Sequence, residues 1–140
     1  METPASTQSQ AEQFYSRSEH WKSDLEFFKI ETAFFHRLID DHFAELISAE
    51  YLEKLKIEGK KLYDLERDEN ELSKMLSKHM KELTMIIEGT NPEYPNEYRE
   101  QHSAIERKFN KLTKEYRELK SELFALVEKA MGKKKLINKL

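Results

Sequence analysis

The stretch EYREQHSAIERKFNKLTKEYRELKSELFAL, residues 97 to 126, decides the fold class. Within it, bulky side chains return alternately after four and three residues, a pattern that we call a seam. Its positions are Tyr98, His102, Ile105, Phe109, Leu112, Tyr116, Leu119, Leu123 and Leu126. This spacing keeps one face of an α-helix turned toward a neighbouring helix. We therefore expect a long helix that begins after Asn96, a suitable N-cap, and ends near Gly132.

The segment before it carries a second seam. Its positions are Leu62, Leu65, Glu69, Leu72, Leu76, His79, Leu83 and Ile86. Gly89 is suited to end this helix, and the following GTNPEYPNE contains two prolines and predicts a loop. A loop this short makes the two helices antiparallel.

The first predicted helix begins at Ser18, a suitable N-cap, and is apolar over a wide arc. Its apolar residues are Trp21, Leu25, Phe27, Phe28, Ile30, Phe34, Phe35, Leu38, Ile39, Phe43 and Leu46. Such an arc indicates contact with two neighbours, either two other helices or a second subunit. The turn that follows lies between residues 47 and 59, with a break at Ser48 or at Gly59. Breaks at both would create a short fourth helix near 48–58.

Composition agrees with an all-α protein. Of 140 residues, 38% are hydrophobic and 36% charged, with three Gly and three Pro, as in long helices. We predict an antiparallel bundle of three long helices over residues 18–132. A disordered or loosely docked tail covers residues 1–17, and a short basic tail covers residues 133–140.

Several classes of function find no support in the sequence. The chain has no Cys, which excludes disulfides and thiolate metal sites, and its net charge of −3 gives no indication of nucleic-acid binding. It also lacks a Gly-rich phosphate loop and a nucleophile elbow, so an enzyme is not indicated. Since no apolar run is long enough for a membrane span and no signal pattern opens the chain, we expect a cytoplasmic protein.

Ionisable residues in the seams are the candidate site. Burying an unpaired charge costs several kcal/mol, so each such group needs a partner, a metal or a neutral state. In an antiparallel pair of helices, His79, His102 and Glu106 share one layer. A turn near 48 brings His20 and Trp21 to that layer, whereas a turn near 59 brings His36 and His42 instead.

Two interpretations of this layer stay open. In the first, His79, His102 and Glu106 hold iron, manganese or zinc, with Glu31, His42 and His20 as alternative ligands, or one histidine binds haem. The spacing from His102 to Glu106 is one that hemerythrin-like proteins use, but their full motifs, and those of ferritin-like proteins, are missing. In the second interpretation, which the sequence favours, the histidines are neutral core residues and no cofactor is bound.

The aromatic residues of the first helix also allow two interpretations. Phe27 and Phe34 lie on one flank and Phe28 and Phe35 on the other. They either pack in the core or form an interface with a second copy or with another helical protein. A flank left uncovered in the monomer would indicate the interface.

The segment EHWKSDLEFFKIETAFFHRLI, residues 19 to 39, resembles the first helix of small, uncharacterised bacterial helical-bundle proteins. In those proteins a His near a Trp precedes alternating acidic and aromatic positions. The resemblance implies a bundle fold and carries no function. From the residues we expect a non-enzymatic interaction or scaffold protein, with a metal- or cofactor-binding bundle as the alternative.

Overall fold

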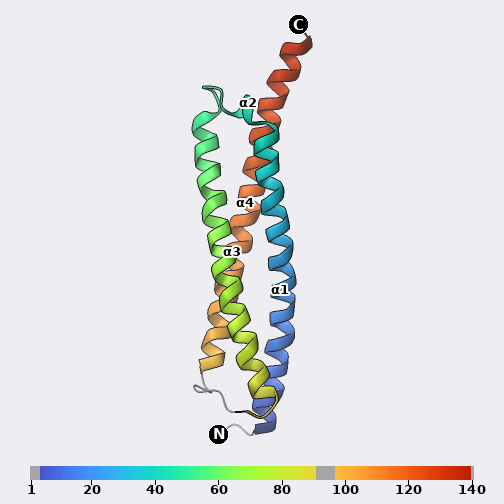
Figure 1. The fold of residues 1–140 in the computed structure, drawn as a ribbon, viewed down its shortest axis with the longest axis vertical. Coiled ribbons are helices and arrows are strands. Elements are labelled where there is room, and N and C mark those ends of the chain that lie inside the picture. Colours follow the sequence, from blue (N-terminus) through green and yellow to red (C-terminus); the bar gives the residue numbers. More distant parts are fainter. Residues whose placement is uncertain (1–3, 91–96, 140) are drawn as a thin grey trace. The chain divides into compact units, whose positions relative to one another are not determined.

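A computed structural model of the chain describes residues 4–90 and 97–139. Within these ranges the regular structure consists of four α-helices without any strand (Figure 1): α1, Pro4–Asp41; α2, Phe43–Leu46; α3, Leu52–Ile87; and α4, Glu97–Lys139. The predicted all-α bundle of three long helices is therefore confirmed. In the part of the chain that is described, no helix combines the length and apolar character needed to cross a membrane.

The helices divide into two compact units. The first contains the described parts of residues 1–27 and 69–111, and the second those of 28–68 and 112–140. Each unit contains one segment each of α1, α3 and α4, and the second unit also contains α2. In the first unit, Gln10 and Trp21 of α1 meet Tyr98 and Phe109 of α4, so these helices run in parallel. In the second, Lys61 of α3 meets Glu122 of α4.

The N-terminal segment differs from the prediction. We expected a disordered or loosely docked tail to Arg17 and an N-cap at Ser18, but α1 begins at Pro4. Ala11 is fully buried, and Ser18 is a buried mid-helix residue whose hydroxyl donates to the carbonyl oxygen of Phe14. The seam of α1 thus starts earlier than its bulky residues indicate, because Ala11 and Ser18 are small.

The junction between α1 and α3 follows the earlier of the two predicted breaks. α1 ends at Asp41, and the short helix α2 ends at Leu46, which is fully buried. The Ser48 carbonyl then accepts the backbone N–H of Leu52, the first residue of α3. Gly59 lies inside α3, so no separate helix forms over 48–58.

The glycines at the ends of α3 and α4 behave differently. Gly89 adopts a φ of +80°, and the N–H of Thr90 donates to the Met85 carbonyl, a Schellman closure that ends α3 as predicted. Gly132, by contrast, does not end α4, which continues to Lys139. Residues 133–139, which we assigned to the short basic tail, thus continue this helix. The predicted N-cap Asn96 lies outside the described residues.

Candidate functional site

A buried histidine pair forms the centre of the first unit. The Nε2 of His79, on α3, lies 3.0 Å from the Nδ1 of His102, on α4. His79 is 1% exposed and His102 is 6% exposed. Both residues occupy positions where the seams of their helices would otherwise place leucine. The sequence prediction that these two side chains share a layer is confirmed.

Aromatic rings of α1 cover this histidine pair. The ring of Phe14 stacks on that of His102 at a centroid distance of 3.8 Å, and the Trp21 ring lies 4.7 Å from His102. The guanidinium of Arg17 lies over the outer part of this layer, 5.5 Å from the Trp21 ring centroid. Since Trp21 rather than His36 or His42 reaches the layer, the alternative with a turn near 48 describes this site.

Burial keeps both imidazoles neutral near pH 7. It lowers the pKa of His79 to about 4, and a positive charge on His102 would lower it further. Burial also lowers the pKa of His102, where the positive charge of Arg17 adds to the effect and the negative charge of Glu106 opposes it. At least one of the two rings must be neutral, because only a neutral imidazole has a ring nitrogen that can accept the hydrogen bond.

The neutral pair is not fully satisfied. If the Nε2 of His79 donates, its Nδ1 is a bare acceptor; if it accepts, its Nδ1 carries a proton. In neither case does this Nδ1 find a hydrogen-bond partner among the described residues, and the indole N–H of Trp21 also finds none. A buried polar atom left in this state costs about 1–3 kcal/mol. The histidine layer is therefore a polar site that lowers the stability of an otherwise apolar seam.

The remaining predicted metal ligands do not join the pair. Glu106 is exposed, one turn beyond His102, and His20 is exposed as well. His42 lies at the junction between α1 and α2. Across residues 4–90 and 97–139, no three His, Cys, Asp or Glu side chains are grouped so that they could hold a metal ion. The structure thus brings together two of the three predicted ligands.

Glu31, another alternative ligand, is bound within the second unit. It accepts a hydrogen bond of 2.7 Å from the Tyr116 hydroxyl and one of 3.0 Å from the Lys120 ammonium. These bonds lower the pKa of the Glu31 carboxyl and keep it ionised. Glu31 is therefore a structural carboxylate that is paired with Tyr116 and Lys120.

A second buried acid was missed by the sequence analysis. Glu58 of α3 is fully buried, with the ammonium groups of Lys54 and Lys61 at 3.5 and 3.7 Å. Lys61 also forms an ion pair of 2.8 Å with Glu122. Burial and the adjacent Glu122 carboxylate raise the pKa of Glu58. The seam of α3 indicates this position, because Glu58 lies three residues after Leu55 and four before Leu62.

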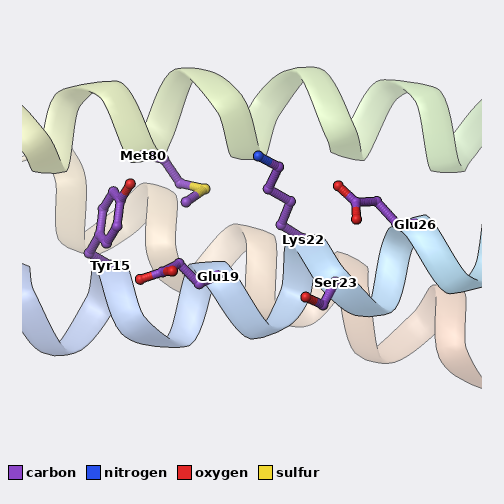
Figure 2. A pocket seen from close by; sticks show the side chains of 6 residues that line it. All are labelled: Tyr15, Glu19, Lys22, Ser23, Glu26 and Met80. Atoms are coloured by element: carbon purple, nitrogen blue, oxygen red, sulfur yellow. The ribbon is translucent and has the colours of Figure 1, made fainter.

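A shallow groove of about 290 Å³ lies beside the histidine layer in the first unit (Figure 2). It is lined by Tyr15, Glu19, Lys22, Ser23 and Glu26 of α1 and by Met80 of α3. The Lys22 ammonium reaches toward α3, between the carboxylates of Glu19 and Glu26 (Figure 2). Because these charges alternate and the lining is largely exposed, the groove has the character of a solvated helix surface.

The four predicted interface phenylalanines divide into two groups. Phe28 and Phe35 belong to the core, where their rings lie 4.6 and 5.8 Å from that of Tyr116. Phe27 and Phe34 stay exposed, by 53% and 39% of their surface. Of the four, only the second group thus keeps a large exposed surface, and the ring of Phe34 also makes edge contacts with those of Phe35 and Phe124.

Comparison of the chain with protein-family models, with curated proteins and with solved structures found no match. The resemblance of residues 19–39 to bacterial bundle proteins stays a prediction.

Proposed function

We propose that this chain is a non-enzymatic interaction or scaffold protein of the bacterial cytoplasm, which acts by packing α1 against a helix of a partner. The observation that carries the proposal is the exposure of three large apolar residues on one side of α1. Phe27, Ile30 and Phe34 are 53%, 67% and 39% exposed. Single exposed apolar residues are common, but three that are neighbours along one helix face are typical of a docking surface.

The other side of α1 makes the proposal more specific. Trp21, Phe28 and Phe35 are buried and already provide the core contacts of this helix. Phe34 also makes edge contacts with Phe35 and with Phe124 of α4, both at 6.4 Å, yet part of its surface stays exposed. α1 therefore has apolar residues on a second side, as in a helix that packs against two neighbours.

Photo-crosslinking in cells tests this proposal. Phe34 is replaced by the photo-reactive benzoylphenylalanine, with the same replacement at Ser121, an exposed residue of α4, as the matched control. We expect a discrete protein adduct from position 34 and none from position 121. Equal adducts from both positions, or none from either, would refute a docking role for this face.

A metal-binding bundle is the second candidate, and the close approach of His79 and His102 favours it. Zinc binds imidazole nitrogen at about 2.0–2.1 Å, which places two nitrogens of a tetrahedral shell roughly 3.3 Å apart. The 3.0 Å between the two histidine nitrogens is close to this value. The remaining ligands would have to come from water or from a partner.

A further inference from the structure

The first part of α1 is held in the first unit by few large side chains. We call residues 4–20 of this helix the leading segment. Of residues 6–20, only Ala11 and Ser18 are buried, and both are small. The two aromatic residues of the segment are only half-buried. Because burial stabilises roughly in proportion to the apolar area removed from water, the leading segment gains little from its docking.

The two helices against which the leading segment packs are held much more firmly. Ala11 packs in a cluster with Leu83 and Ile86 of α3 and Tyr98 of α4. In the first unit these helices bury seven large apolar residues: Leu72, Leu76, Leu83, Ile86, Tyr98, Ile105 and Phe109. Elements with few buried apolar contacts open locally at a lower free energy than the core. We therefore expect the leading segment to detach before α3 and α4 separate.

The composition of the leading segment also favours its opening. Its sequence PASTQSQAEQFYSRSEH contains four Ser and one Thr, which are weaker helix formers than Ala. A polar helix of this length is marginal in water without tertiary contacts. Once detached, the segment should therefore also lose its helical structure, in agreement with the tail that the sequence predicts.

The histidine pair lies under this weakly held segment. Phe14 of the segment stacks on the ring of His102 at 3.8 Å, and His102 in turn bonds to His79. Detachment removes Phe14 from this layer and admits water to it. The Nδ1 of His79, which has no hydrogen-bond partner among the described residues, then gains one from water. This gain offsets part of the cost of opening.

We propose that the leading segment is a reversible cover of the histidine pair: it detaches while α3 and α4 stay packed, and this opening is the route by which water and small solutes reach His79 and His102. The inference does not depend on the proposed function, since it concerns a different part of α1. For the metal-binding candidate, it supplies the entry path that a buried site needs.

Carbethoxylation of histidine by diethylpyrocarbonate at pH 7 tests this route. Mass spectrometry of peptides measures the rate at each histidine, and the exposed His20 serves as an internal standard. Phe14→Ala weakens the docking and should raise the rates at His79 and His102 about 30-fold. Phe124→Ala, which removes a half-buried aromatic residue of the second unit, is the matched control and should leave both rates unchanged.

A second variant changes the opening in the other direction without altering the core. Ser9 and Ser16 are exposed, so replacing both by Ala raises helix propensity and leaves the buried contacts intact. The double variant Ser9→Ala/Ser16→Ala should slow modification of the histidine pair about fivefold. Hydrogen exchange should slow by the same factor over residues 8–20 and stay unchanged over residues 72–86 of α3.

Three results would overturn the proposal. The first is equal acceleration of labelling by Phe14→Ala and Phe124→Ala, which would mean that the pair becomes accessible only by global unfolding. The second is labelling of the pair that neither Phe14→Ala nor the serine variant changes, since the route would then lie elsewhere. The third is equal protection of residues 8–20 and 72–86 from exchange, which would exclude a separate opening of the leading segment.

Discussion

Acid should destabilise this protein through the histidine pair, and the effect can be calculated. His79 has an ordinary pKa of 6.5, which burial lowers to about 4 in the folded chain. As the pH falls below 6.5, the unfolded chain takes up a proton at this residue while the folded chain does not. The free energy of unfolding therefore falls with decreasing pH, and this contribution is complete at about pH 4.

The gap between the two pKa values sets the magnitude. At about 1.4 kcal/mol per pKa unit, His79 alone removes about 3 kcal/mol of stability between pH 6.5 and 4. His102 acts in the same direction, because burial also lowers its pKa. Such a loss is a large part of the 5–15 kcal/mol that is typical of a native domain.

The variant His79→Leu isolates this effect, because other titrating groups cancel between the two proteins. Near pH 7 the two should differ little: leucine removes the unsatisfied Nδ1 of His79 but leaves the Nδ1 of His102 without its bond. By pH 4 the variant should be more stable by about 3 kcal/mol. Urea unfolding followed by circular dichroism at pH 7, 6, 5 and 4, at fixed ionic strength, measures the difference. A difference that stays constant with pH would refute the assignment of the acid sensitivity to this layer.

Four further predictions concern other residues and the metal. Tyr116→Phe removes the hydrogen bond to the Glu31 carboxylate and should lower the free energy of unfolding in urea by about 1–2 kcal/mol; an unchanged midpoint would exclude a stabilising role for that bond. Burial raises the pKa of Glu58 above its ordinary 4.5, so the unfolded chain ionises first as the pH rises. The melting temperature of Glu58→Gln minus that of the unchanged protein should therefore increase from pH 4.5 to 7. A difference that decreases over this range would contradict the prediction. Phe14→Ala removes the ring stacked on His102 and should cost about 2–3 kcal/mol in urea unfolding, whereas a truly disordered tail predicts no change. Dialysis against a chelator should leave the melting temperature unchanged if the histidines are neutral core residues; a drop that zinc reverses would establish the metal-binding candidate.

Most of the fold could be predicted because α3 and α4 carry large side chains at nearly every seam position. Periodicity is visible only where side chains are bulky and apolar. In α1 the early seam positions are held by Ala11 and Ser18, and so the sequence indicated a tail. The predicted end of the last helix at Gly132 was wrong for a different reason. A glycine permits a helix to end but does not require it to do so.

The candidate site could be predicted in part. The antiparallel pairing of α3 and α4 follows from a short loop, and it placed His79 beside His102 correctly. The part played by α1 depended on a turn whose position the sequence left open between 47 and 59. The burial of Glu58 was not predicted because a charged residue is normally expected to be exposed. Only its spacing from the neighbouring seam residues indicates that it is buried.

The parallel course of α1 and α4 has a consequence for synthesis on the ribosome. Glu31 is synthesised before its hydrogen-bond partners Tyr116 and Lys120, which lie 85 and 89 residues later in the chain. At roughly 5–20 residues per second, its partners emerge about 4 to 18 seconds later. During that interval the inner aromatic face of the nascent α1 has no α4 to cover it. Chaperones that recognise exposed aromatic helices would meet this protein at its first helix, before its last has been translated.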